Sequence, residues 1–308
     1  MKLTTIDFAN SFGENENEIA PSVRALIEEN EIVLSPIIAH ERDMLLVEII
    51  QRIRNDKQVI ASSDRTSVWE KGWGENLELF RNKPDSDAAL VPKFVRPEQP
   101  IRWFQKYYRT NMSNFELTYI HILRQFVITK YFAQSEHLYE FGAGTGFNLL
   151  HANKLFPQLK LIGTDFVRPA VDLMNEVGVR RGLPLRASLF NMLSPELEDL
   201  RLKPNSAVWT FGSIEQLGGR VTPMINFLIE NRPNIVVHIE PVAEFYEKDS
   251  LEDYLAKWFQ TKRGYTEGLI KILNSHQDSG NIEILKSHRL NFGSLMMEGY
   301  NLIIWRTV

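Results

Sequence analysis

His137-Leu-Tyr-Glu-Phe-Gly-Ala-Gly-Thr-Gly-Phe-Asn148 is the stretch of sequence that decides the fold of this chain. Its apolar start predicts a buried strand, its centre a glycine-rich turn, and its end the first residues of a helix. Gly142, Gly144 and Gly146 follow Glu140, and glycines at such positions let the backbone turn tightly and approach a ligand without interference from a Cβ atom. Taken alone, the segment is also compatible with a simple turn from strand to helix.

A carboxylate completes the pattern at the end of the next apolar run, Leu159-Lys-Leu-Ile-Gly-Thr-Asp165. In folds that bind dinucleotides, a carboxylate at this position accepts hydrogen bonds from the hydroxyl groups of a ribose. The competing interpretation is that Asp165 caps the helix that follows. Together, the glycine turn and Asp165 predict that an adenosine-bearing cofactor is held against a helix N-terminus.

Strands and helices alternate from residue 137 onward, which indicates an α/β domain with a doubly wound, mostly parallel sheet and helices on both faces. The predicted strands are 137–141, 160–165, 184–189, 206–212 and 234–240, and the predicted helices lie near 146–156, 168–181 and 221–231. A helical region follows from Leu251 to about Asn274. Two final apolar runs, Ile282–Leu290 and Tyr300–Thr307, predict a terminal antiparallel pair.

The first part of the chain has a different pattern. Residues 42–54 and 114–132 carry apolar side chains at helical spacing, so we expect amphipathic helices there. The segment between them that runs from Trp69 to Pro100 is interrupted by glycines and prolines, and we expect loops, short elements or a mobile cover. We therefore divide the chain into a mainly helical substrate or cap region, 1–132, and a cofactor-binding domain, 133–308.

Composition excludes several classes of function. The 308 residues carry a formal net charge of −4 and no block of Lys or Arg, which argues against a nucleic-acid partner. No apolar run approaches the roughly 20 residues that span a bilayer, and the N-terminus lacks the pattern of a signal peptide. The absence of cysteine excludes disulfides, thiolate zinc sites and cysteine nucleophiles. We expect a cytoplasmic protein without a membrane or nucleic-acid partner.

Residues 137–308 resemble the class I S-adenosylmethionine-dependent methyltransferases. The matching segments are Glu140-Phe-Gly-Ala-Gly-Thr-Gly146, Gly163-Thr-Asp165-Phe, Phe190-Asn191-Met192 and Phe211-Gly-Ser-Ile-Glu-Gln-Leu217, and the closing hairpin also fits. The resemblance implies a seven-stranded doubly wound sheet with an antiparallel final strand. It further implies S-adenosylmethionine as the cofactor and S-adenosylhomocysteine as its product. The N-terminal region resembles no family in this way.

The resemblance also implies a set of cofactor contacts. The predicted cofactor-binding residues are Glu140, Gly142, Gly144, Gly146, Asp165, Phe166, Asn191, Met192 and Ser213. In the family, the glycine loop passes beneath the methionine portion of the cofactor, the glutamate orients its amino end, and an Asp or Asn lies near the adenine amino group. Three of these residues have ordinary alternatives, because Phe166 also suits burial in the sheet interface, Asn191 a loop, and Met192 core packing.

The predicted catalytic residues are Glu215, His238 and Glu240. A base is needed only when the acceptor loses a proton during attack, and these three follow the ends of predicted strands. His238 and Glu240 alternate along one strand and so point to the same side. The alternatives are a satisfied histidine inside the sheet interface and a carboxylate paired with a nearby base. The sequence departs from the family in placing Gln216 where relatives commonly have histidine.

Other residues carry weaker signals. His238 and Glu240 lack a clear third ligand, so we predict no metal site, and His276 and His288 have no local pattern that favours a role as base. Aromatic residues flanked by Arg102 and Arg109 suit either a small-molecule pocket or the packing of the helical region on the sheet. These aromatic residues are Trp103, Phe104, Tyr107 and Tyr108, with Trp69 and Trp73 earlier in the chain.

The expected function is transfer of a methyl group from S-adenosylmethionine to an oxygen or nitrogen atom of a small-molecule acceptor. Two alternatives remain open at this point. One is a peptide or protein methyltransferase, and the other is a non-catalytic S-adenosylmethionine-binding protein that acts through a partner.

Overall fold

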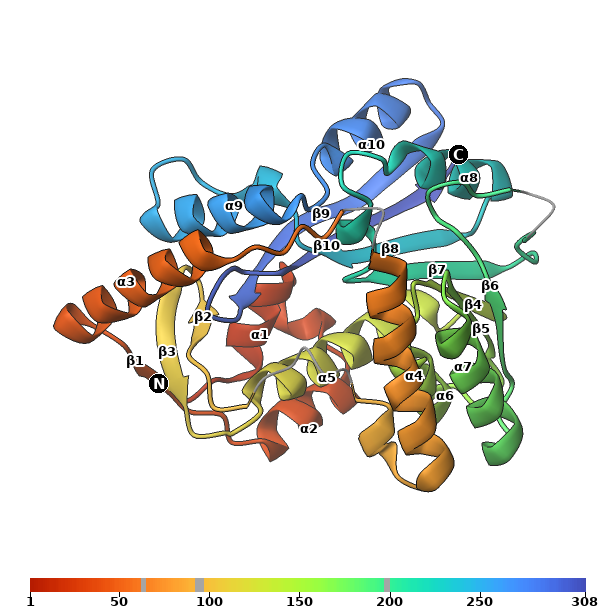
Figure 1. Cartoon of the computed structure of the whole chain (residues 1–308), viewed down its shortest axis with the longest axis horizontal. Helices are drawn as coiled ribbons and strands as arrows, with labels where there is room; N and C mark the ends of the chain where they lie inside the picture. Colours follow the sequence, from red (N-terminus) through yellow and green to blue (C-terminus); the bar gives the residue numbers. More distant parts are fainter. Residues whose placement is uncertain (62–64, 92–96, 197–199) are drawn as a thin grey trace.

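The computed structural model of the chain describes residues 1–308 except 62–64, 92–96 and 197–199. Within the described residues, ten strands form one mixed sheet in the order β1-β3-β2-β9-β10-β8-β7-β4-β5-β6 (Figure 1). The strands from the second part of the chain are β4 (His137–Phe141), β5 (Lys160–Asp165), β6 (Leu185–Leu189), β7 (Ser206–Phe211), β8 (Ile235–Glu240), β9 (Ile282–Gly293) and β10 (Tyr300–Thr307).

Five parallel strands confirm the predicted doubly wound α/β architecture. Their order, β6-β5-β4-β7-β8, reverses direction between β4 and β7, where the chain crosses from one half of the sheet to the other. The predicted closing hairpin is confirmed as well, because β10 lies antiparallel between β8 and β9. These seven strands reproduce the expected core of the sheet, and the sequence placed each of the five parallel strands to within a residue.

The expectation of a seven-stranded, mostly parallel sheet beside a mainly helical N-terminal region was wrong in two respects. The sheet is mixed, because every pairing from β8 through β10 to the edge strand β1 is antiparallel. The strands β1 (Leu34–Pro36), β2 (Ile101–Trp103) and β3 (Lys106–Thr110) extend the same sheet beyond β9. Residues Arg102 and Trp103 of β2 pair with Gly293 and Phe292 of β9. Because these strands are short and β2 is buried at every position, they carry no alternation from which a strand could be predicted. The two parts of the chain therefore share one sheet.

Helices cover both faces of the sheet (Figure 1). The helices of the N-terminal region are α1 (Thr5–Phe12), α2 (Pro21–Glu29), α3 (Ala39–Asn55), α4 (Thr66–Asn82) and α5 (Phe115–Val127), and α5 continues into a π-helical turn, Ile128–Phe132. The later helices are α6 (Phe147–Leu155), α7 (Arg168–Arg181), α8 (Thr222–Asn231), α9 (Leu251–Arg263) and α10 (Leu269–Asp278). Apolar side chains from α1, α2, α5, α6 and α7 share one core with the sheet, and those from α8 and α10 share the other.

The predicted loop segment between Trp69 and Pro100 contains a helix instead. Helix α4 spans Thr66–Asn82, and it buries Asn76, Leu77 and Phe80 although it includes two glycines. A Cβ atom at either glycine would meet no atom within 4 Å, so both lie on open faces of the helix, where glycine costs little packing. Residues 92–96 of the same predicted segment lie outside the described residues. The helical region predicted after Leu251 is divided into α9 and α10 by Gly264 and Gly268, both at positive φ.

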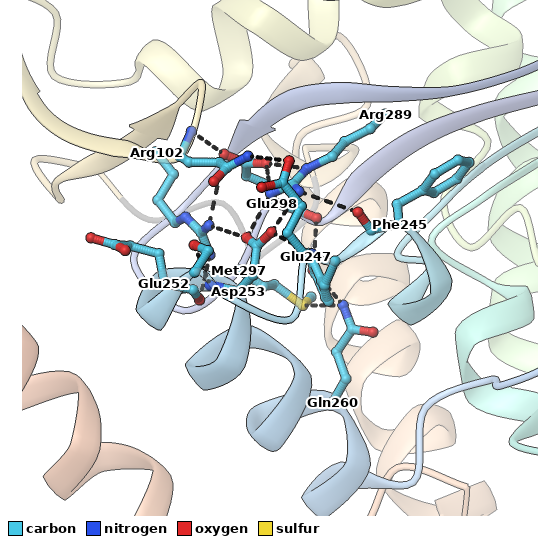
Figure 2. Close-up of polar contacts among 12 residues, drawn as sticks. Arg102, Phe245, Glu247, Glu252, Asp253, Gln260, Arg289, Met297 and Glu298 are labelled. Atoms are coloured by element: carbon cyan, nitrogen blue, oxygen red, sulfur yellow. Dashed lines mark hydrogen bonds and ion pairs between the residues drawn. The ribbon is translucent and has the colours of Figure 1, made fainter.

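A buried network of charges joins the N-terminal strands to the second part of the chain (Figure 2). The Arg102 guanidinium from β2 donates to Asp253 Oδ1 of α9 at 2.9 Å, and Arg289 of β9 donates to both oxygens of the same carboxylate at 2.6 and 2.7 Å. Arg289 also lies 2.5 Å from Glu298, and all four side chains are at most 10% exposed. Two guanidinium groups therefore balance two carboxylates in the interior.

No helix among the described residues is both long enough and apolar enough to cross a membrane.

Candidate functional site

The carboxyl ends of β4 and β7 meet at the point where the strand order reverses, which is where open α/β sheets bind their ligands. Gly142 follows β4 at φ +71°, and a Cβ atom there would lie 2.5 Å from Ser213 Cβ and 3.4 Å from Met192 Cε. The Ser213 hydroxyl donates to the Phe141 carbonyl at 2.8 Å. The structure thus brings three predicted cofactor residues together, and only glycine fits at position 142.

Gly144 and Asp165 meet directly. The Gly144 N–H donates to Asp165 Oδ2 at 3.0 Å, and the Val167 N–H donates to Asp165 Oδ1 at 3.3 Å. Burial raises the pKa of Asp165 to about 6, and these backbone donors act against that rise. The Asp165 carboxylate holds the glycine turn against the end of β5. It also binds the backbone just before α7, so the alternative interpretation, that Asp165 caps this helix, is partly correct.

Glu140 lies beneath the turn and faces α5 and α6. Its Oε1 accepts from Asn148 Nδ2 at 2.6 Å, while its Oε2 is buried without a hydrogen-bond partner among the described residues. Trp209 is its register neighbour on β7, and the indole N–H lies outside hydrogen-bond geometry. Burial raises the pKa of Glu140 to about 8. Next to the glycine turn, this buried oxygen is therefore available to a polar group of a ligand.

Two further predicted cofactor residues, Phe166 and Asn191, lie at the surface end of the site, whereas Gly146 is buried. Phe166 follows Asp165 with 44% of its surface exposed, so its ring is available to a ligand and is not buried in the sheet interface. Asn191 is exposed and makes local contacts, accepting from the Leu193 N–H at 3.0 Å and donating to Ser194 Oγ at 3.2 Å. These contacts correspond to the ordinary loop interpretation of Asn191. Gly146, at φ +74°, begins α6.

The N-terminal region covers this edge of the sheet. A Cβ atom on Gly144 would lie 2.7 Å from the Trp73 ring, which stacks on Trp69 with ring centroids 5.7 Å apart. The Thr145 hydroxyl donates to the Leu90 carbonyl at 2.7 Å. Helix α4 itself packs beside α7, where Arg81 lies 2.5 Å from Glu176 (Figure 1). Trp73 and residues 87–90 therefore lie directly on the glycine turn.

His238 is enclosed within the sheet. Its Nδ1 lies 2.9 Å from the Thr210 hydroxyl, and its Nε2 accepts from the Trp305 indole N–H at 3.0 Å. The side chain is fully buried, and burial lowers its pKa to about 3. With both ring nitrogens engaged and the neutral form favoured, His238 has the geometry of the satisfied interior histidine and not that of a base.

Glu240 also has an internal role. It accepts from the backbone N–H groups of Ser213 and Ile214 at 3.1 and 3.2 Å and from that of Glu215 at 3.3 Å. These donors begin the short 3₁₀ helix Ile214–Leu217, so the carboxylate caps that helix. The partners of Glu240 are therefore backbone N–H groups and not the basic side chain that the alternative interpretation of the sequence predicts. Burial raises its pKa to about 7.

Of the three predicted catalytic residues, Glu215 differs from His238 and Glu240. Its carboxyl group is not engaged by the hydrogen bonds that hold the other two side chains. Burial and the neighbouring Glu240 raise the pKa of Glu215 well above its ordinary value, while Arg263 and Arg65 act in the opposite direction. A raised pKa makes a carboxylate a stronger base once it is ionised. His276 and His288 are engaged elsewhere, with Asn281 and with the Ser11 carbonyl.

The aromatic cluster around residues 102–109 belongs to the packing of the molecule. Trp103 and Tyr107 are at most 3% exposed and lie in two apolar cores. Arg102 is part of the buried charge network, and Arg109 is paired with Glu41. Both arginines therefore already have carboxylate partners, which favours the packing interpretation over a ligand clamp.

Sequence reasoning missed several residues at the turn. Asn148 is visible in the opening stretch, but its contact with Glu140 depends on how α6 leaves the turn. Arg124 reaches this region from α5, which is distant in sequence, and no local pattern marks it, whereas Trp73 was named only as one of several aromatic residues. No group of three or more possible metal ligands occurs among the described residues.

No protein-family model and no curated protein matches the chain. Among solved structures, the [4+2]-cyclase SpnF is similar with a TM-score of 0.52 at 13% identity, over 81% of this chain and 97% of that one. Geranyl diphosphate C-methyltransferase from Streptomyces coelicolor A3(2) is similar with a TM-score of 0.45 at 12% identity, over 64% of this chain and 81% of that one. A SAM-dependent methyltransferase from Aquifex aeolicus follows with a TM-score of 0.42 at 14% identity, over 59% and 88%.

The similar solved structures are mostly S-adenosylmethionine-dependent methyltransferases. The chain has the class I fold of the S-adenosylmethionine-dependent methyltransferases.

Proposed function

We propose that this protein binds S-adenosylmethionine at the turn after β4 and transfers its methyl group to an oxygen or nitrogen atom of a small-molecule acceptor. The observation that carries the proposal is the contact between Gly144 and Asp165 at the switch point of the sheet. This contact joins the glycine turn and the carboxylate that an adenosine-bearing ligand requires into one rigid unit.

The residues at the turn fit such a cofactor. Glu140 offers a buried acceptor oxygen without a partner, which suits the ammonium group of the methionine portion. Asp165 retains acceptor capacity for ribose hydroxyls, because each carboxylate oxygen accepts more than one hydrogen bond. The exposed ring of Phe166 lies at the end of β5, where an adenine would stack. When bound, the cofactor supplies an electrophilic methyl group on a sulfonium centre.

The cover over the turn has a role in this proposal. The Trp73 ring occupies the face of Gly144 over which the methionine portion would pass. Helix α4 must therefore shift for the cofactor to enter, and it then excludes water from the reacting atoms when it returns. Helix α4 is held both by the exposed ion pairs of Arg81 and by Leu77 and Phe80 in the apolar core, so this shift costs buried contacts as well as ion pairs.

Catalysis in this proposal rests mainly on position. Alignment of the acceptor lone pair with the methyl group supplies much of the rate, and a base is needed only for an acceptor that loses a proton. Glu215 takes that role, because Glu240 is occupied by three backbone donors and His238 by Thr210 and Trp305. Glu240 acts through Glu215 as a positioning residue, since it caps the helix on which Glu215 lies.

Calorimetry with S-adenosylhomocysteine tests the cofactor assignment. We expect binding to the wild type and at least about a tenfold loss of affinity in Asp165→Ala, since a charge-assisted pair of hydrogen bonds is removed. Asp172→Ala is the matched control, because Asp172 lies on α7 in an exposed pair with Arg168. Normal affinity in Asp165→Ala, with the fold intact by circular dichroism, would contradict the assignment.

Turnover separates methyl transfer from the two alternatives. Formation of S-adenosylhomocysteine with a fraction of a small-molecule extract supports the proposal, and formation with a peptide pool supports a peptide or protein methyltransferase. Binding without turnover in either pool supports a non-catalytic cofactor-binding protein. Two observations support the non-catalytic alternative. His238 and Glu240 are both held by internal hydrogen bonds, and a protein of similar fold is a cyclase.

A further inference from the structure

A second pocket lies behind the glycine turn, between α5, α6, the end of α7 and residues 87–90. Its volume is about 490 Å³, within the range of small-molecule sites. Its walls contain none of the residues assigned above to the cofactor or to proton transfer. The lining side chains include Arg124 and His121 from α5 and His151 and Lys154 from α6.

The charges on the walls are unbalanced. Arg124, Lys154 and Arg181 line the pocket together with one carboxylate, Asp87. Asp87 lies 2.6 Å from Arg181 and 3.5 Å from Lys154, so both of its oxygens serve those two cations. Arg124 is left without a carboxylate partner on the walls. The pocket therefore carries an excess of positive charge.

Arg124 is the most informative residue of the pocket. Only 3% of its side chain is exposed, yet its nearest polar contacts are Asn148 Oδ1 at 3.3 Å and the Phe147 carbonyl at 3.5 Å. Its Nε has no partner among the described residues. Its guanidinium lies 4.2 Å from the centroid of the Phe147 ring. A buried cation with such weak partners is costly, because little compensates the hydration that it has lost.

Two histidines add further unpaired polar groups. The rings of His121 and His151 are nearly perpendicular with centroids 4.6 Å apart, and His151 Nε2 is buried without a partner among the described residues. Burial and the nearby Arg124 keep the pKa of His151 near 3, so the ring is neutral at physiological pH. A neutral imidazole still donates one N–H, and a ligand acceptor can receive it.

Most of the rest of the wall is apolar, apart from Thr118 and Asn153. Leu117, Leu150 and Leu183 line the pocket together with Leu90 and the Phe147 ring. A ligand that satisfies both kinds of wall has an anionic end for Arg124 and an apolar body for the leucines. Inorganic anions satisfy only the first requirement.

We propose that this pocket binds a small organic anion, a carboxylate or a phosphate monoester that carries an apolar group, with the Arg124 guanidinium as its principal contact. The anion supplies the charge-assisted partner that Arg124 lacks, and the imidazole of His151 donates beside it. Asn148 bonds both Arg124 and Glu140, so the site also adjoins the glycine turn through one side chain. The inference does not depend on the proposed methyl transfer.

Nuclear magnetic resonance of the full chain tests this site directly. The imidazole resonances of His121 and His151 are followed while phenyl phosphate, benzoate, inorganic phosphate or neutral benzyl alcohol is added. We expect phenyl phosphate or benzoate to shift both histidines with saturation below about 1 mM, and benzyl alcohol to have no effect. Whether the phosphate or the carboxylate binds more tightly identifies the anionic group. Equal binding of inorganic phosphate and phenyl phosphate overturns the organic part of the proposal.

Two variants keep the test decisive. Arg124→Gln should weaken binding of the preferred anion by about tenfold or more, because a bidentate charged contact is lost. Lys154→Gln, whose side chain is 70% exposed and so safe for folding, should weaken it by about two- to threefold through lost long-range attraction. Arg109→Gln on β3 is the control and should leave binding unchanged.

Two results overturn the proposal. One is the absence of any shift of His121 and His151 with either organic anion at about 10 mM. The other is an unchanged affinity in Arg124→Gln while the variant remains folded by circular dichroism.

Discussion

Two buried arginines in this molecule have opposite surroundings. Arg102, at the junction of β2 and α9, is fully buried and lies 2.9 Å from Asp253 and 3.8 Å from Glu298 (Figure 2). Arg124, behind the glycine turn, is almost equally buried, but its hydrogen-bond partners are a backbone carbonyl and an amide oxygen. One cation lies inside a balanced network, while the other lines a pocket whose single carboxylate, Asp87, is paired with Arg181 and Lys154.

The difference separates structure from binding. A network in which each guanidinium has a carboxylate stabilises one arrangement of the chain, and here that arrangement holds the N-terminal strands on the sheet. A buried charge without a partner costs stability, and such groups persist where a ligand provides the missing partner. Perturbing each region in turn should therefore give opposite results.

Asp253→Ala should have the largest effect. The substitution leaves the guanidinium groups of Arg102 and Arg289 with one carboxylate, so we expect a loss of about 3–5 kcal/mol in the free energy of unfolding. Chemical denaturation measures this loss. Glu283→Gln is the control, because its pair with Arg306 is about half exposed and should contribute no more than about 1 kcal/mol. A loss below about 1 kcal/mol in Asp253→Ala would show that the network is not structural.

Glu140→Gln should make the free energy of unfolding less dependent on pH. Burial raises the pKa of Glu140 from 4.5 to about 8, so the folded state holds a proton that the unfolded state releases in between. The stability contributed by this group is therefore complete below about pH 4.5 and is lost as the pH rises toward about 8. Glutamine cannot ionise, so the variant should lose less stability over this range.

The measurement is the free energy of unfolding at several pH values in this window. Asp165 and Glu240, whose pKa values are raised to about 6 and about 7, keep some of the slope in the variant. Equal slopes in the wild type and Glu140→Gln would mean that Glu140 is not protonated in the folded protein.

Thr145→Val should loosen the cover over the turn without disturbing the network at Arg102. It removes the 2.7 Å hydrogen bond to the Leu90 carbonyl, for which we expect about 1 kcal/mol of local stability. Amide hydrogen exchange should become faster around residues 87–90 and remain unchanged in β2. Uniform acceleration throughout the chain would indicate global destabilisation instead.

Arg124→Met should have the smallest effect on stability. Methionine retains an apolar stem against the Phe147 ring and removes a poorly paired charge, so the free energy of unfolding should stay unchanged or rise by up to about 1 kcal/mol. Arg102→Met is the matched comparison and should lower it clearly, because Asp253 then loses one of its two cations. Thermal melting compares the two. Similar losses in both variants would remove the distinction between the two regions.

The sequence predicted the α/β part of the fold because its signals are local. Strands β4 and β5 are continuous apolar runs followed by the glycine turn and by Asp165, and these positions were confirmed. Helix α4 was missed because its two glycines are typical of loops, whereas its formation depends on burying Leu77 and Phe80 beneath it.

Within the site, the sequence alone shows which residues lie at the strand ends but not which groups they bond. His238 is engaged by Trp305, 67 residues later, and Glu240 by the backbone of a loop 25 to 27 residues earlier. Arg124 stands in an ordinary amphipathic pattern, and only the packing of α5 on α6 shows that it is buried with an unpartnered Nε. Tertiary partners of this kind decide which polar residues remain free, and no local spacing encodes them.

The pairing of β2 with β9 has a consequence for the synthesis of the chain. Arg102 leaves the ribosome 151 residues before Asp253, and β2 waits still longer for its strand partners in β9. Until then, the three N-terminal strands have exposed backbone edges, and the guanidinium of Arg102 stays hydrated. Such long-range closure is slow and leaves the nascent chain open to association. Placement of the N-terminal strands in the sheet therefore depends on β9, which is synthesised much later than they are.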